Sequence, residues 1–136
     1  MKRKSIITAC VLVIAVLAVV LLNPFGKKPF AKLSADEIVS AELFLIPPET
    51  TIKLTEKEDL AELTDILNEL VIYRKDDSGR DYNGQLVQVT ITLKNGQTHI
   101  VGAFNPFLFL NNNCYRTKYE PCEKLNVFGN RILKEQ

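Results

Sequence analysis

The sequence is poor in the residues from which most catalytic and metal centres are built. Its 136 residues include one histidine, three cysteines and no tryptophan. Three cysteines, one of them in an apolar run, are too few for the disulfide framework of a small secreted domain. The sequence also lacks a glycine-rich phosphate loop, a nucleophile elbow and zinc-ligand spacing. We therefore expect a protein that is not an enzyme, and we predict no cofactor.

The chain also has no large excess of positive or of negative charge. The chain holds 17 basic and 16 acidic residues, a formal net charge of +1. Without Lys2, Arg3 and Lys4, 14 basic and 16 acidic residues remain, so the rest of the chain carries −2. This balance indicates neither a nucleic-acid-binding surface nor an acidic tail, and no nucleic-acid partner is predicted.

One stretch has no charge at all, and it runs from Ile6 to Leu22. At about 1.5 Å of rise per residue, a helix of this length covers most of a hydrocarbon core roughly 30 Å thick. A helix also satisfies its own backbone hydrogen bonds, as apolar lipid requires. We predict a transmembrane signal-anchor helix over residues 1–22, with membrane lipid around residues 6–22.

The flanking charges indicate the orientation of this helix. Lys2, Arg3 and Lys4 adjoin the apolar run directly, whereas residues 23–26 separate the later lysines from it. This is the layout of a secretory signal, so we predict a single-pass protein of the cell membrane with a cytoplasmic N-terminus and an extracytoplasmic remainder. Cleavage after Ala18 and lipid attachment at Cys10 are the alternatives.

The remaining residues divide into a linker and one domain. Residues 23–32 carry two prolines, one glycine and three lysines without periodicity, which is typical of a solvated linker. Residues 33–136 are enough for one domain with one hydrophobic core.

Hydrophobic patterns in residues 33–136 predict an α+β fold. Apolar alternation is clearest over residues 85–93, and the Lys94–Gln97 segment after it predicts a type I′ hairpin turn. One amphipathic helix opens at a capping box of Thr55 and Glu58, and a second carries Pro121 in its first turn. We expect a mainly antiparallel sheet covered on one face by the two helices. Its strands are predicted over residues 38–46, 51–54, 71–74, 85–93, 98–104, 107–110 and 114–118.

Two groups of residues could carry chemistry. Asp77, Gly79, Asp81 and Asn83 fall at alternating positions in a polar loop, as calcium ligands do. Gly79 offers only a carbonyl, however, and Gln88 stands where a bidentate glutamate is needed, which favours a solvated turn. His99 has no carboxylate or nucleophile near it in the sequence, which favours an exposed strand histidine. A small envelope hydrolase that uses His99 with Asp77 or Asp81 remains an alternative.

Cys114 and Cys122 could form a disulfide bond outside the cell. An extended run from Cys114 to Tyr119 carries the chain about 16 Å, whereas bridged Cα atoms lie within about 7 Å of each other. Cys114 is also predicted to point with Arg116, and Cys122 belongs to the apolar stripe of the last helix. We favour unbridged thiols, with Cys122 buried.

Two loop segments are distinctive enough to suggest ligand binding: Tyr82-Asn83-Gly84-Gln85 and Asn105-Pro106-Phe107. Aromatic residues on loops often anchor partners. We predict a binding site formed by Tyr82, Gln85, Phe107 and Tyr115. Residues 107–110 could instead offer a strand edge to a peptide, although burial as a central strand is the favoured interpretation.

Three segments carry a resemblance: residues 46–52 (Ile-Pro-Pro-Glu-Thr-Thr-Ile), residues 82–85 (Tyr-Asn-Gly-Gln) and residues 119–123 (Tyr-Glu-Pro-Cys-Glu). They resemble a family of small, functionally uncharacterised secreted or membrane-anchored proteins of Gram-positive bacteria. The likeness covers residues 38–133. It implies one extracytoplasmic domain and adds no site residue, because the family has no assigned function.

Together these observations predict a membrane-anchored extracytoplasmic domain that acts as a non-enzymatic binding or interaction module at the cell envelope. A protein or peptide is the expected partner outside the membrane. Besides the hydrolase, a structural accessory subunit held beside another membrane protein is an alternative.

Overall fold

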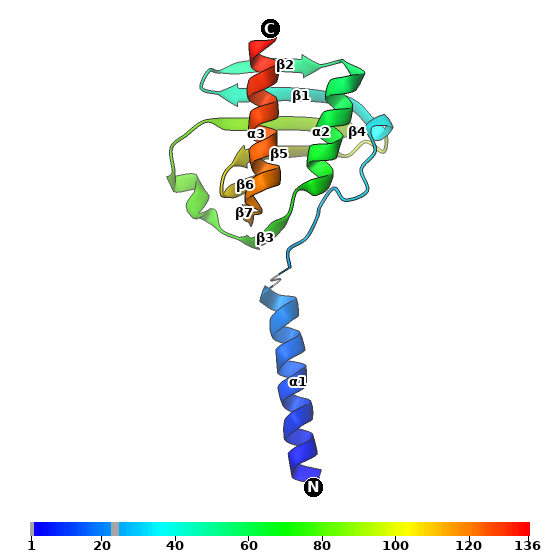
Figure 1. Cartoon of the computed structure of the whole chain (residues 1–136), viewed down its shortest axis with the longest axis vertical. Coiled ribbons are helices and arrows are strands. Elements are labelled where there is room, and N and C mark those ends of the chain that lie inside the picture. The colour runs from blue at the N-terminus through cyan, green and yellow to red at the C-terminus, as the bar shows by residue number, and fades with distance from the viewer. Residues whose placement is uncertain (1, 23–24) are drawn as a thin grey trace.

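The computed structural model describes residues 2–22 and 25–136, so that Asn23 and Pro24, with which the predicted linker begins, lie outside it. Helix α1 (Lys2–Leu22) stands apart from the globular part of the chain (Figure 1). Its stretch from Lys2 to Leu21 is long and apolar enough to cross a membrane, and none of that stretch is buried.

The globular part is one antiparallel sheet of seven strands with two further helices, which confirms the predicted α+β fold. Two short 3₁₀ turns, η1 (Ala35–Glu37) and η2 (Asp77–Asp81), complete it. The helices are α2 (Lys57–Glu69) and α3 (Tyr119–Lys134), and the strands are β1 (Ile38–Ile46), β2 (Thr50–Leu54), β3 (Ile72–Lys75), β4 (Leu86–Leu93), β5 (Thr98–Phe104), β6 (Phe107–Leu110) and β7 (Asn113–Thr117).

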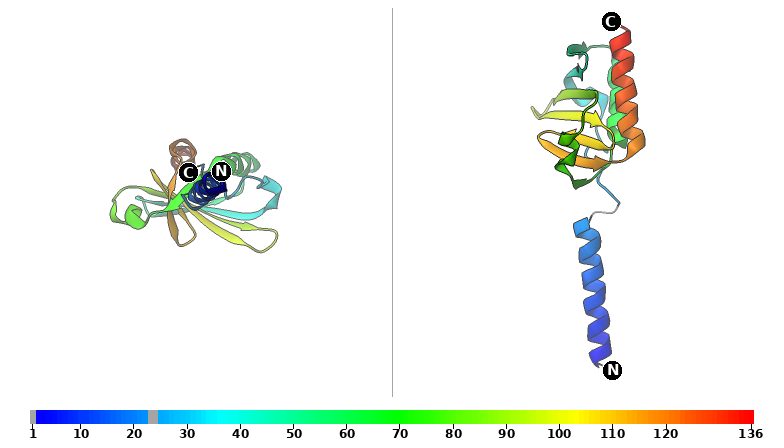
Figure 2. Two further views of the ribbon diagram at one scale, coloured as in Figure 1. Left: turned by 90° about the horizontal axis from the view of Figure 1, so that it is seen from below. Right: turned by 90° about the vertical axis from the view of Figure 1, so that its left-hand side faces the viewer.

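The strands are ordered β2-β1-β4-β5-β6-β7-β3, so β2 and β3 form the two edges of the sheet. Strand β6 pairs with both β5 and β7, as expected for a central strand. Helices α2 and α3 lie on the same side of the sheet (Figure 2).

The hydrophobic core lies between this face and the helices. Leu43, Val89 and Val101, from three neighbouring strands, are fully buried there, and α2 and α3 contribute residues such as Leu67 and Phe128. Alternation along the strands produces this arrangement, because every second side chain points to the same face.

Two local predictions were wrong. Helix α2 begins at Lys57 after an N-cap at Glu56 that has no side-chain cap, so Thr55 lies outside the helix and the predicted capping box does not form. In the β4–β5 turn only Gly96 has a positive φ, whereas a type I′ turn needs positive φ at both central residues.

The segment predicted as a solvated linker is attached to the domain from Gly26 onward. Lys27 pairs with Ile72 of edge strand β3 through two backbone hydrogen bonds of 2.8 Å. Phe30 is 6% exposed and belongs to the core. The Asn68 side-chain amide donates to the carbonyls of Phe30 and Leu33 at 2.9 and 3.0 Å. A single buried ring among lysines and prolines leaves no periodicity, so the sequence pattern concealed this docking.

The two phenylalanines of this segment provide a matched test of the docking. Phe30→Ala should lower the free energy of unfolding by about 3 kcal/mol, because it removes a buried ring. Phe25→Ala should change it by less than about 0.5 kcal/mol, because Phe25 is 86% exposed. Denaturant unfolding of the full chain in detergent, followed by circular dichroism, measures both. Equal effects of the two substitutions would contradict the docking.

Candidate functional site

The polar loop after β3 covers part of the sheet face that the helices leave open. Its Gly79 is buried, and a Cβ atom there would lie 2.6 Å from Phe107 Cγ and 2.7 Å from Cys114 Sγ. Only glycine therefore permits the close packing of this loop against β6 and β7. The loop, which the sequence pattern predicted as a solvated turn, thus covers part of β6 and β7 at Gly79.

The acidic groups at the start of the loop are occupied by protein partners. Asp76 accepts hydrogen bonds from the Ser78 hydroxyl at 2.6 Å and from Arg116 Nε at 2.8 Å, and these lower its pKa to about 2. Asp77 pairs with Arg80 at 3.3 Å. Within residues 2–22 and 25–136, no group of three or more His, Cys, Asp or Glu side chains is arranged to hold a metal ion.

Beside this loop lies a pocket of about 450 Å³, which we call the Tyr82 pocket. It is formed where the segment before β4 meets the β5–β6 turn and the middle of α3. Its lining residues are Tyr82, Asn83, Gly84, Gln85, Ala103, Phe104, Asn105, Pro106, Phe107, Arg116 and Asn126. Both loop segments that the sequence singled out therefore meet in one place.

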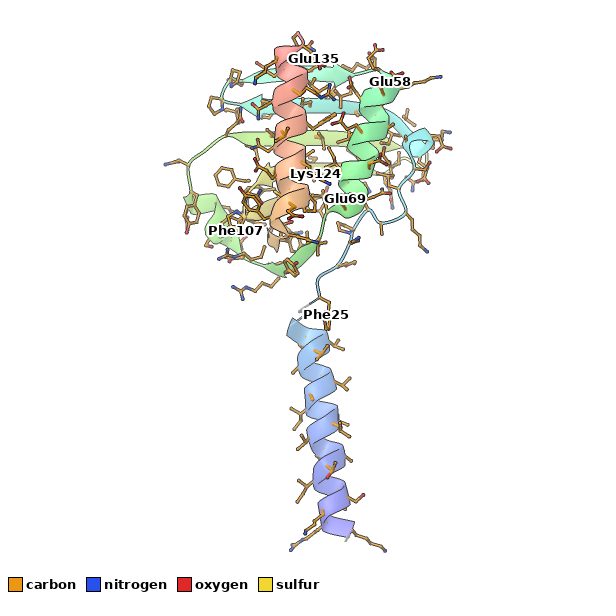
Figure 3. The ribbon with its side chains drawn as sticks, in the orientation of Figure 1. Phe25, Glu58, Glu69, Phe107, Lys124 and Glu135 are labelled. Carbon is orange, nitrogen blue, oxygen red and sulfur yellow. The ribbon has the colours of Figure 1, made fainter. Side chains whose placement is uncertain are left out.

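Aromatic rings make up the apolar side of the Tyr82 pocket. The ring of Tyr82 stacks on that of Phe107 with 5.8 Å between centroids, and it remains 63% exposed. The Arg116 guanidinium lies 4.7 Å from the Phe107 centroid on another side. Phe107 is buried between these groups, beside the lower part of α3 (Figure 3). Tyr82 is thus available to a ligand, whereas Phe107 supports it from below.

Asn105 lines the pocket and carries a buried polar atom without a partner in the described part of the chain. Its Nδ2 donates to the Tyr119 carbonyl at 3.1 Å and to Glu123 Oε2 at 3.2 Å, which fixes the orientation of the amide. Its Oδ1 is buried and has no hydrogen-bond partner among the residues that the structure describes. A buried acceptor without a partner costs about 1–3 kcal/mol, so a donor brought by a ligand would be stabilised here.

Gln85 holds the pocket wall in place. Its Nε2 donates to the Pro47 carbonyl in the β1–β2 connection at 2.9 Å, and its Oε1 accepts from Asn130 Nδ2 of α3 at 2.9 Å. Both ends of the side-chain amide are thus engaged within the fold. The residue predicted to contact a ligand instead joins three parts of the chain around the pocket.

Tyr115 is not brought together with the other three predicted site residues. It pairs with Leu108 and packs, half-buried, against the core on the helix-covered face. Its neighbour Arg116 lines the pocket instead, because successive strand residues point to opposite faces. Choosing the other face of this strand would have found Arg116. No signal in the sequence pointed to Asn126.

His99 is half-buried rather than exposed. Its ring meets Phe30 edge-on with 5.4 Å between centroids, so the docked segment before the domain covers it. It pairs with Ile91 on the helix-covered face. The loop that carries Asp77 and Asp81 packs on the opposite face, so the structure does not bring His99 together with either carboxylate.

The cysteines of the domain are unbridged. Cys114 lies on the loop-covered face and Cys122 lies on α3, where its thiol is 3.5 Å from the Phe107 carbonyl. Burial raises the pKa of both thiols, that of Cys122 to about 12. Neither thiol is therefore activated as a nucleophile.

A second hollow, of about 570 Å³, runs between α2 and α3. Ion pairs cross it: Lys124 meets Glu69 at 2.8 Å, and Arg131 meets Glu62 at 2.7 Å and Asp59 at 3.1 Å. Figure 3 shows Glu69 and Lys124 facing each other from the two helices. These pairs hold the helices together on the outside of the core.

No protein-family model, curated protein or solved structure matches this chain. The resemblance to small anchored proteins of Gram-positive bacteria therefore stays a prediction. The function has to be argued from the geometry of the pocket and the position of the anchor.

Substitutions at Gln85 and at the nearby Gln88 test the role of Gln85. Gln85→Ala should lower the free energy of unfolding by about 1–2 kcal/mol, because it removes two hydrogen bonds and leaves the Pro47 carbonyl without this donor. Gln88→Ala is the control, since Gln88 is also half-buried but forms no side-chain hydrogen bond with the described residues. It should change stability by less than about 0.5 kcal/mol. Denaturant unfolding measures both free energies. An unchanged free energy of unfolding for Gln85→Ala would show that the contacts of Gln85 do not support the pocket.

Proposed function

We propose that this chain is a membrane-anchored, extracytoplasmic binding module whose Tyr82 pocket holds a segment of a peptide or protein partner. The observation that carries the proposal is a pocket whose wall exposes the Tyr82 ring and includes Asn105, the residue whose buried Oδ1 has no partner among the described residues. A pocket with a few fixed polar groups beside apolar rings is typical of a binding site.

The chemistry of the lining favours binding over hydrolysis. Among the residues that line the Tyr82 pocket there is no carboxylate, histidine, serine, threonine or cysteine. General acid–base or nucleophilic catalysis needs a group of this kind or a phenol within hydrogen-bond reach of the reacting atoms, and the Tyr82 phenol is the one such group among these lining residues. The guanidinium of Arg116 is already held by Asp76. What remains is a set of amides, one exposed phenol and aromatic rings.

A peptide segment matches these groups better than a charged metabolite would. A ligand that reaches Asn105 Oδ1 needs an N–H or O–H donor, which every peptide unit except proline supplies. The rings of Tyr82 and Phe104 offer apolar surface to a side chain that follows. Aromatic residues of this kind are frequent anchors in protein recognition.

The proposed location depends on α1 and its flanking charges. The helix can cross a membrane by length and composition. The three basic residues adjoining its start favour a cytoplasmic N-terminus. With that orientation the pocket would lie on the extracytoplasmic side of the membrane.

Cysteine labelling tests this topology. In a Cys10→Ala background, Gln136→Cys should react with a membrane-impermeant maleimide in intact cells whose outer layers are permeable to it. Ser5→Cys is the matched control and should react only after lysis. The native Cys114 and Cys122 are buried and should stay unlabelled throughout. The reverse pattern at the two introduced cysteines would contradict the topology.

Site-specific photocrosslinking tests the pocket itself. A benzophenone amino acid at position 82 of the full chain in cells should give a discrete polypeptide adduct, identified by mass spectrometry. The same probe at Val39 should give none, because Val39 is equally exposed (64%) but lies on β1 outside the pocket. Asn105→Ala should weaken the adduct at position 82. Equal adducts at both positions, or none at position 82, would contradict the proposal.

A further inference from the structure

The docking of Lys27 leaves very little chain between the anchor and the domain. Helix α1 ends at Leu22, and Lys27 is fixed to Ile72 of β3 by two backbone hydrogen bonds. Five residue steps span at most about 18 Å when fully extended. Lys27 therefore cannot move further than this from the end of α1, and Ile72 of β3 lies one strand spacing, about 5 Å, from Lys27.

Basic side chains gather at this edge of the domain. Lys27 and Lys28 lie exposed on the docked segment, and Arg74 and Lys75 lie exposed on β3. Lys118 joins them, because its backbone N–H donates to the Val71 carbonyl at 3.1 Å. We call these five residues the basic edge.

Acidic residues are few at the basic edge: Glu120, two residues after Lys118, is exposed, whereas Glu69 and Asp76 are paired. Residues 25–35 and 70–75 contain no Asp or Glu. The flanking Glu69 is paired with Lys124 at 2.8 Å, and Asp76 is paired with Arg116 at 2.8 Å. The basic edge is thus a local excess of positive charge on a domain whose total charge is slightly negative.

An exposed aromatic ring marks the same place. Phe25 is 86% exposed and lies between the upper end of α1 and the domain (Figure 3). Apolar rings next to basic residues are a recurring feature of surfaces that rest in a membrane interface. Figure 1 shows β3 as the strand of the sheet that faces α1.

We infer that the basic edge binds the headgroups of anionic phospholipids and so holds the domain in a fixed orientation on the bilayer. This inference rests on the proposed membrane anchoring by α1. The sheet order places β2 at the edge opposite β3, so β2 is then the strand farthest from the membrane. The Tyr82 pocket then opens to the side of the domain. The short tether lets the basic edge reach the membrane surface, where the attraction acts within a Debye length of about 10 Å at 0.1 M salt.

Charged residues on an edge strand can also serve only to prevent edge-to-edge aggregation. The two roles are separable, because glutamate protects an edge as lysine does but is repelled by anionic lipid. A double charge reversal, Arg74→Glu with Lys75→Glu, therefore keeps the edge charged while removing the proposed lipid contact. Lys53→Glu with Lys57→Glu is the matched control, since both lysines are exposed on β2 and at the start of α2, away from the basic edge.

The test uses the full chain with Cys10→Ala, reconstituted in vesicles of phosphatidylcholine with or without phosphatidylglycerol. A fluorophore at Ala31→Cys, beside the basic edge, is quenched by a nitroxide on the lipid headgroup, and a fluorophore at Gln136→Cys reports the far end of α3. Vesicles with the same composition in both leaflets make the result independent of the direction of insertion.

We expect stronger quenching at position 31 on anionic vesicles than on neutral ones, with little change at position 136. High salt should abolish the difference. Each reversed charge should weaken lipid association by at least about fivefold, so the Arg74→Glu, Lys75→Glu protein should lose the difference while the Lys53→Glu, Lys57→Glu protein keeps it. Circular dichroism confirms that both variants are folded.

The outcomes separate this inference from the proposed anchoring. Equal quenching on neutral and anionic vesicles, or no effect of the Arg74→Glu, Lys75→Glu reversal, overturns lipid binding by the basic edge while the anchoring stands. A protein that fails to float with vesicles of either composition overturns both.

Discussion

The pairing of Lys27 with Ile72 is the contact on which the arrangement of this protein depends. Two backbone hydrogen bonds add the segment after α1 to the exposed edge of β3, and Phe30 secures it by entering the core. An open sheet edge is a liability that proteins commonly cover. Here the covering segment around Lys27 is also the connection to the anchor. The same residues therefore protect part of the edge and limit the distance between the domain and the membrane.

The candidate site follows from the two faces of the sheet. One face is covered by α2 and α3, and the loop around η2 covers part of the other. The Tyr82 pocket forms at the end where these covers meet the β5–β6 turn. Gln85 links the pocket wall to the β1–β2 connection and to α3, and Gly79 allows the loop to close on Phe107. The pocket is therefore fixed by the fold, whereas the Tyr82 ring remains exposed to a partner.

The sequence predicted the strands and helices well because their signals are local. Alternation located β1, and turn signals with apolar runs located β5 and β6, at the bounds that the structure has. The apolar stripes located α2 and α3. It failed where a contact joins distant residues. Phe30 gives no periodic signal, yet it is buried against strands far along the chain and beside His99. In the site, the two loop segments carried recognisable residue types, but the face of β7 was chosen wrongly at Tyr115, and Asn126 of α3 could be found only from the packing.

Amide hydrogen exchange of the full chain in lipid nanodiscs tests the central claim most directly. If the segment after the anchor is docked, the Lys27 amide should be protected to a degree similar to that of Ile72, its hydrogen-bond partner on β3. Exchange of Lys27 at the rate of an unstructured peptide, while core amides such as that of Val89 stay protected, would show that the segment is a loose linker. The domain would then be tethered by the anchor, but at no fixed distance from the membrane.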